Sequence, residues 1–170
     1  MRPPTDDQLV AAARRLGRNL TERGWQMATA ESCTGGMVGH VITQVPKSSD
    51  HFLGGIVSYS DAVKEELLGV SPALIGQAGA VSAEVAEAMT LGVLARFPIA
   101  RLAVGVTGIA GPDGGSDEKP VGLTYIAAAL RHGPATVERH LWSHDRDGNK
   151  RASVLAALEL AARLAAKAPE

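Results

Sequence analysis

Short apolar segments of strand length alternate with amphipathic segments of helical period along most of this chain. The strand-like segments are 27–30, 54–59, 102–107, 121–130 and 135–142. The last two follow each other across a His-Gly-Pro turn with no helix between them, which favours an antiparallel pair. The earlier alternation is typical of helices that cover a parallel sheet. We therefore predict an α/β fold: a single layered α/β/α domain over residues 1–170, with a mostly parallel sheet and an antiparallel edge.

The size and charge of the chain limit the possible partners. With 170 residues, one domain has a sizeable core, whereas two domains would each be cramped. A formal net charge of −1 provides no broad basic field, so we expect neither a nucleic acid nor a membrane as partner. No apolar run reaches the roughly 20 residues of a membrane span.

Cysteine and histidine are too sparse to suggest a metal centre. Cys33 is the only cysteine, so the chain has no internal disulfide, and His132, His140 and His144 lack a metal-ligand spacing. We expect no metal and no cofactor. A single thiol and the lack of an apolar leader fit a reducing, cytoplasmic location.

Residues 30–36 read Ala-Glu-Ser-Cys-Thr-Gly-Gly and lie between the first predicted strand and a helix. Small hydroxyl residues and paired glycines at such a corner let backbone N–H groups approach an anionic ligand closely. The corner also offers Ser32, Cys33 and Thr34 as nucleophiles or donors, with Gly35 and Gly36 behind them. The same pattern is common as a purely structural helix cap, so residues 30–36 alone do not decide between the two interpretations.

Lys64 falls on the first turns of a helix that Ser60 or Asp61 can cap, close to Tyr59 at the end of a strand. A cation near a helix N-terminus is electrostatically disfavoured. Either its side chain is solvated, or the lysine is held neutral and acts as a base. The position of Lys64 alone leaves both possibilities open.

A glycine-rich stretch, 108–120, follows the predicted strand at 102–107. It is either a functional loop or a disordered excursion, and its apolar residues favour an ordered loop that contacts a ligand. Thr107 stands at its root, and Gly108, Ile109, Ala110 and Gly111 begin it.

Arg146 precedes the last helix and could serve an anionic ligand or pair with a neighbouring aspartate. Ser32, Tyr59 and the loop after Thr107 each follow a strand. We therefore expect them to meet at the C-terminal edge of the sheet, where such folds bind ligands.

With these segments assembled, the chain resembles the CinA C-terminal domain family of nicotinamide mononucleotide (NMN) amidohydrolases, from about residue 8 to residue 162. The order and spacing of several motifs carry the resemblance: 30–36, Val-Ser-Tyr-Ser at 57–60 with Lys64, Gly-Ala-Val-Ser at 79–82, 108–116, Lys-Pro-Val-Gly at 119–122, and Asp-Arg-Asp at 145–147. Two stretches depart from common family forms, at His144 and at residues 61–63. Neither departure removes an expected catalytic group.

The resemblance implies hydrolysis of the carboxamide of NMN to nicotinate mononucleotide and ammonia, in the recycling of pyridine nucleotides. It implies Ser32 as nucleophile, Lys64 as its general base, and Tyr59 and Arg146 as further active-site residues. The backbone N–H groups of residues 33–35 would hold either the oxyanion or the substrate phosphate, and the sequence does not assign which. Cys33 is a rival nucleophile, since a thiol at a helix N-terminus would be activated.

Two further expectations concern the wider role of the chain. A catalytically silent nucleotide-binding or interaction module of the same family is the alternative function. The alanine-rich helical segment at 156–166 suggests a face for a second subunit, so we expect a homodimer. Longer family members carry an additional N-terminal domain. This sequence does not contain it, so we expect a stand-alone enzyme.

Overall fold

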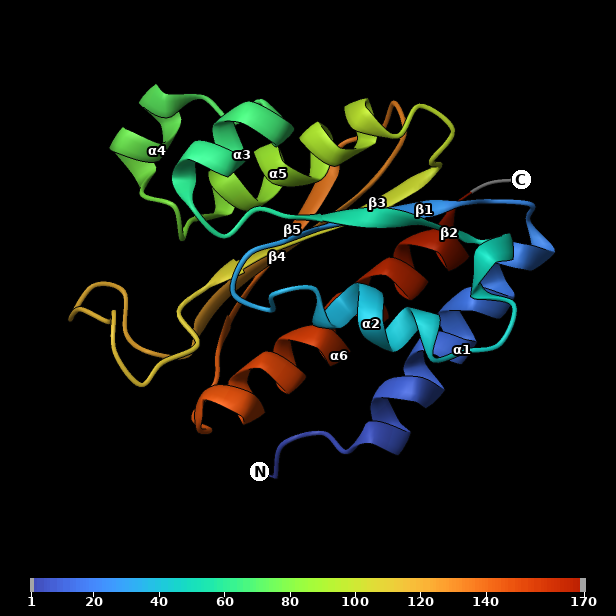
Figure 1. The fold of residues 1–170 in the computed structure, drawn as a ribbon, viewed down its shortest axis with the longest axis horizontal. Helices are drawn as coiled ribbons and strands as arrows, with labels where there is room; N and C mark the ends of the chain where they lie inside the picture. Colours follow the sequence, from blue (N-terminus) through green and yellow to red (C-terminus); the bar gives the residue numbers. More distant parts are fainter. Residues whose placement is uncertain (1, 169–170) are drawn as a thin grey trace.

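A computed structural model, which describes residues 2–168, contains a five-stranded mixed sheet in the order β2-β1-β3-β4-β5 (Figure 1). Its strands are β1 (Met27–Glu31), β2 (Phe52–Val57), β3 (Leu102–Gly108), β4 (Leu123–Leu130) and β5 (Ala135–Leu141). β1 runs parallel to both β2 and β3, whereas β4 is antiparallel to β3 and β5 is antiparallel to β4. The predicted parallel part and antiparallel edge are confirmed.

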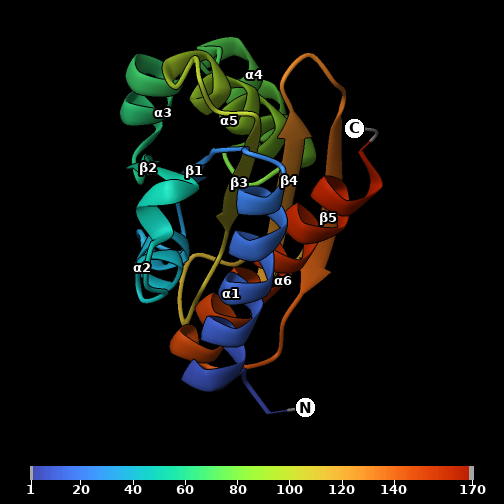
Figure 2. The ribbon, with the colours of Figure 1, turned by 90° about the vertical axis from the view of Figure 1, so that its right-hand side faces the viewer.

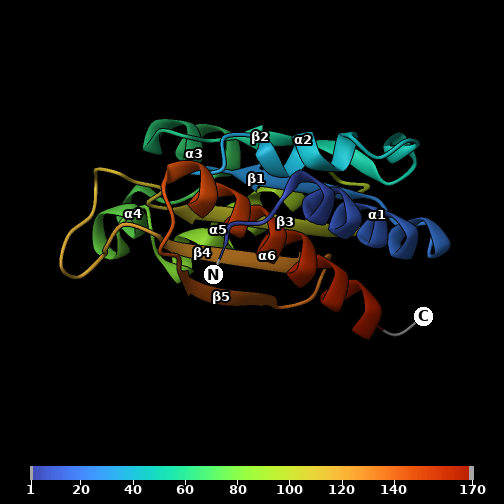
Figure 3. The ribbon, with the colours of Figure 1, turned by 90° about the horizontal axis from the view of Figure 1, so that it is seen from below.

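Helices cover both faces of the sheet and complete three layers (Figures 1 and 3). On one face lie α1 (Asp6–Glu22), α2 (Met37–Thr43) and α6 (Arg146–Lys167), and on the other lie α3 (Asp61–Leu68), α4 (Pro72–Ala78) and α5 (Ala83–Arg96). A short 3-10 helix, η1 (Ser48–Asp50), leads into β2. The side view in Figure 2 shows α1 and α6 packed alongside each other beneath the sheet.

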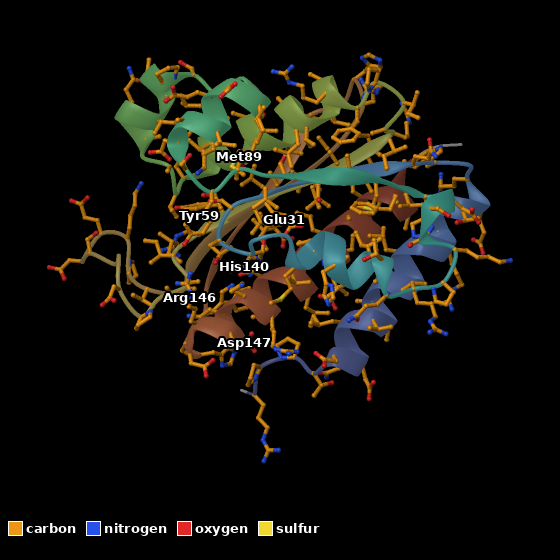
Figure 4. All side chains as sticks on the ribbon, viewed as in Figure 1. Glu31, Tyr59, Met89, His140, Arg146 and Asp147 are labelled. Atoms are coloured by element: carbon orange, nitrogen blue, oxygen red, sulfur yellow. The ribbon has the colours of Figure 1, made fainter. Side chains whose placement is uncertain are left out.

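Each helical layer buries an apolar face against the sheet. β1 is buried along its whole length because α2 packs on one side of it and α5 on the other. Met89 of α5 is fully buried in the core between the sheet and the α3–α5 layer (Figure 4), as expected for a core methionine. Burial of a side chain of this size contributes about 1.5–3 kcal/mol.

The helices begin where the sequence provides caps. Thr5 and Gln8 form a reciprocal capping box at the start of α1, and the Asp145 carboxylate accepts the N–H of Gly148 at the start of α6. The strand boundaries differ most from the prediction at β2 and at the start of β4. β2 begins at Phe52 and ends at Val57, so Ser58 and Tyr59 lie beyond the strand, and β4 begins at Leu123 because Gly122 has a positive φ of 91°.

The alanine-rich face of α6 does not form a free surface. Ala157, Ala161 and Ala165 are buried in the core between the sheet and the layer of α1, α2 and α6, where α6 packs on α1, β3 and β4. The sequence argument for a homodimer therefore loses its basis, because these alanines pack within the chain itself.

Gly17 of α1 is required by close packing. A Cβ atom at this position would lie 2.7 Å from Cε1 and Nε2 of the buried His51 ring. Gly76 of α4 is a matched contrast, since nothing lies within 4 Å of a Cβ placed there.

We predict that Gly17→Ala lowers the free energy of unfolding by about 1–3 kcal/mol, because the ring must shift within a packed interior. Gly76→Ala should leave it unchanged or raise it by about 0.5–1 kcal/mol, since alanine favours the helix. Urea denaturation of both variants tests this pair, and equal effects would contradict the packing argument.

Candidate active site

The C-terminal ends of β1 and β3 and the segment after β2 open into one cleft of about 250 Å³. Figure 4 shows Tyr59 and Arg146 at this edge, beside the glycine-rich loop. The residues that line the cleft are Ser32, Cys33, Tyr59, Asp61, Lys64, Ala80, Val81, Thr107, Gly108, Ile109, Ala110, Gly111, Asp113, Gly114 and Arg146. The convergence expected from strand order is therefore observed. Among the sequence-predicted site residues, Thr34, Gly35 and Gly36 lie outside this lining.

Ser32 is held at the cleft by the end of the sheet. Its N–H donates to the Val106 carbonyl at 2.9 Å, which extends the β1–β3 pairing by one residue. Its carbonyl accepts the N–H of Gly35 at 3.0 Å, so the chain turns directly behind it. Gly35 and Gly36 have φ values of 62° and 93°, a left-handed conformation that glycine adopts at little cost. The two glycines shape the corner and do not contact the cleft.

The first amides of α2 are already bonded within the chain. The buried Glu31 carboxylate accepts the N–H groups of Gly36, Val38 and Gly39 at 2.9–3.0 Å, and the Thr34 hydroxyl at 2.7 Å. The sequence proposed the N–H groups of residues 33–35 as donors to a ligand anion. Of these, the N–H of Gly35 is bonded to the Ser32 carbonyl. The N–H groups of Cys33 and Thr34 precede this bonded set. Glu31 was not among the sequence-predicted site residues, although it belongs to the motif at residues 30–36.

Lys64 is buried, with 1% of its surface exposed, although it lines the cleft. Its Nζ atom donates to the Tyr59 carbonyl at 3.2 Å and to Oδ1 of Asp61 at 3.4 Å. Ser60 caps α3 by accepting the N–H of Val63, which places Lys64 on the first turn with its side chain directed back toward the strand end. The solvated alternative for Lys64 is therefore wrong.

Cys33 has the opposite character to an activated thiol. Burial raises the pKa of Cys33 from 9.0 to about 12, and the neighbouring Glu31 carboxylate adds to the rise. The thiol is therefore protonated at neutral pH. This result corrects the expectation that a helix N-terminus would activate Cys33, because desolvation outweighs the nearby backbone N–H groups.

The glycine-rich stretch is an ordered wall of the cleft and not a disordered excursion. The Thr107 hydroxyl at its root donates to the Ala80 carbonyl at 2.8 Å. Lys119 near its far end donates to the carbonyls of Ala78 and Val81. Both contacts fasten the loop to the turn between α4 and α5, which forms another part of the lining.

Asn149 of α6 anchors the start of the same loop. It is 2% exposed, its side-chain N–H donates to the Ala110 carbonyl at 3.0 Å, and its Oδ1 accepts the N–H of His144 at 3.0 Å. Sequence reasoning gave no role to Lys119 or Asn149. The signal that was available for Asn149 was a polar side chain on the buried face of an amphipathic helix.

Arg146 spans the mouth of the cleft. One guanidinium N–H donates to the Gly111 carbonyl, and Nη2 donates to the Tyr59 hydroxyl at 3.3 Å. Within residues 2–168, Arg146 makes no ion pair, so the alternative pairing with an aspartate is not observed. Because Arg146 is exposed, the positive charge of its guanidinium faces whatever enters the cleft.

Other features of the described chain bear on cofactors and membranes. No three His, Cys, Asp or Glu residues between 2 and 168 are grouped so as to hold a metal ion. None of the helices in that range is both long enough and apolar enough to cross a bilayer.

Comparison with known proteins identifies the family. The model of the CinA C-terminal domain matches residues 10–165. The chain belongs to this family. Among its CinA relatives, the Pseudomonas putida nicotinamide-nucleotide amidohydrolase PncC is 47% identical over 90% of this chain and 94% of its own length. The Escherichia coli K12 protein of the same name is 43% identical, over 91% of this chain and 93% of its own.

Longer CinA relatives and solved structures agree with this assignment. A putative competence-damage inducible protein of Moorella thermoacetica is 46% identical over 92% of this chain, which spans only 37% of that protein. The competence/damage inducible protein of Agrobacterium tumefaciens has the same fold, with a TM-score of 0.90 and 38% identity over 96% of this chain and 98% of that one.

We predict that Ser32→Ala abolishes catalytic turnover of NMN by this CinA domain, whereas Cys33→Ala retains most of that activity. The protonated, buried Cys33 thiol should also react slowly with iodoacetamide at pH 7.5 in the native protein and rapidly in urea. Turnover assays and mass spectrometry of the alkylated chain measure the two effects. Loss of activity in Cys33→Ala alone would reverse the assignment of the nucleophile.

Proposed function

We propose that this chain is a nicotinamide-nucleotide amidohydrolase that converts NMN and water to nicotinate mononucleotide and ammonia. The observation that carries the proposal is the cleft, where a serine, a buried lysine, a tyrosine and an arginine line one cavity. Relatives named for this activity match the chain along nearly their whole length.

The first half-reaction uses Ser32 and Lys64. A serine hydroxyl is a weak nucleophile unless a base takes its proton, and we assign that role to Lys64, which lines the same cleft. As the Ser32 oxygen bonds to the carboxamide carbon, its proton passes to the Lys64 amine. The tetrahedral intermediate then collapses, the C–N bond breaks, and Lys64 returns the proton to the departing ammonia. The product is an ester between Ser32 and the nicotinoyl group.

The second half-reaction releases the acid. A water molecule attacks the ester, loses its proton to Lys64, and the Ser32 oxygen leaves with that proton. In both halves the N–H group of Cys33, which lines the cleft, would stabilise the oxyanion, an effect worth roughly 3 kcal/mol per donor. The amides of Gly36, Val38 and Gly39 are bonded to Glu31, so we assign them no contact with the substrate.

We assign the phosphate end of the substrate to Arg146. Its guanidinium group is the exposed cation at the cleft mouth, and guanidinium binds phosphate with two parallel hydrogen bonds. Tyr59 would hold Lys64 through its main-chain carbonyl and Arg146 through its hydroxyl. The residues from Thr107 to Gly111 would enclose the nucleotide. The proposed mechanism uses no metal or cofactor, and a nucleotide substrate fits a cytoplasmic enzyme.

The homodimer expected from the sequence stays a proposal, and the alanine-rich face that suggested it is buried within the chain. Light scattering on the purified protein measures its mass directly, and the mass of a monomer would end this proposal.

The test of the function is ammonia release from NMN, without added metal, by wild type and Lys64→Ala. Wild type should release ammonia, and the variant should be slower by about 100- to 10,000-fold, as expected when a general base is removed. Lys47→Ala removes an exposed lysine outside the cleft and should match wild type.

Other outcomes would change the assignment. Equal release by wild type and Lys64→Ala would keep the enzyme and reject the base. Tight binding of NMN without release by wild type would favour the silent binding module. Faster hydrolysis of free nicotinamide than of NMN would reject the nucleotide as the substrate.

A further inference from the structure

Glu31 has the environment of an internal ligand. It is the last residue of β1, pairs with Val57 on one side and Val106 on the other, and is 2% exposed. Figure 4 places it next to the cleft end of the sheet, yet it is not part of the cleft lining. A buried carboxylate is costly unless donors surround it.

Five donors surround this carboxylate. Oε2 accepts the N–H groups of Gly36 and Val38, each at 3.0 Å, and the Thr34 hydroxyl at 2.7 Å. Oε1 accepts the N–H of Gly39 at 2.9 Å, with the Thr29 hydroxyl at 3.5 Å. Hydrogen bonds to an ionised acceptor are roughly twice as strong as neutral ones.

Four of these donors, all except the Thr29 hydroxyl, belong to one short stretch of chain. They occupy residues 34–39, the turn and first helical positions that directly follow Ser32. α2 is only seven residues long, and its N-cap, Gly36, offers no side chain to bond the free amides. Without the carboxylate, little in the chain would fix the position of this turn relative to β1.

We propose that Glu31 is a positioning residue that fixes the nucleophile corner by binding the start of α2 as an internal anion. The proposal rests on the function assigned above and deepens it. The carboxylate ties the far end of the 32–35 turn and the first residues of α2 to the last residue of β1. Glu31 acts through Ser32 and through the Cys33 amide, without touching the substrate.

Glu31→Gln tests the charge with little change of shape. An amide presents one acceptor oxygen in place of two and a donor that faces backbone N–H groups. We expect kcat for NMN to fall about 10- to 100-fold, as displacement of a reacting group by a fraction of an ångström to one ångström does, with KM changed less than threefold. Titration with the product nicotinate mononucleotide should still give one site per chain, which separates lost positioning from lost folded protein.

Two further variants isolate the contact. Thr34→Val removes the hydroxyl donor and should lower kcat in the same way, while Thr34→Ser restores the hydroxyl and most of the rate. Thr90→Val is the matched control, because Thr90 is equally buried but bonds to Ala86 and Ala127 away from the cleft. It should lower the melting temperature without lowering kcat.

A measurement independent of activity separates this proposal from the function it rests on. In Glu31→Gln, the hydrogen-exchange rates of the Gly36, Val38 and Gly39 amides should rise relative to wild type. This increase should be at least ten times larger than the increase at β3 amides. Backbone order parameters at Ser32 to Thr34 should also fall. If wild type does not hydrolyse NMN but these changes occur, the function fails and the positioning stands. Unchanged exchange, or a kcat within twofold of wild type, would overturn the role of Glu31.

Discussion

The parallel pairing of β1 with both β2 and β3 is the constraint on which the rest of the structure depends. Three strands that run the same way must end at the same edge, so the segments that leave them are brought together whatever their distance in sequence. Each strand must also be reached by a crossover, and the crossovers supply the helices on both faces. The cleft is therefore a result of topology, and its chemistry depends on which residues follow each strand.

At this edge, most polar contacts join side chains to main-chain atoms. Lys64 binds the Tyr59 carbonyl, Arg146 binds the Gly111 carbonyl, and Asn149 binds the Ala110 carbonyl. Contacts of this kind fix the course of loops that have no strand ladder of their own. A loop-built site thus gains rigidity from the helices and strands around it.

The elements and the convergence of the site were predictable from the sequence, because strand and helix periods and caps such as Thr5 and Asp145 are local signals. The cleft residues from Ser32 to Arg146 followed from strand order and from family resemblance. The sequence did not predict which groups within the chain contact each side chain. That Glu31 faces α2, or that burial raises the pKa of Cys33, depends on which helix packs over the corner. Similarly, an alanine-rich segment gives the same pattern whether it faces a second subunit or its own sheet.

Lys119 connects two parts of the molecule that are about 40 residues apart in sequence. Its ammonium group bonds two carbonyls of the α4–α5 turn, and the Thr107 hydroxyl bonds a third nearby. The loop and the turn therefore form a single mechanical unit, which can move as one body against Ser32 and Lys64. A displacement of the loop therefore carries the α4–α5 turn with it, so residues of α4 that line no part of the cleft bear on its width.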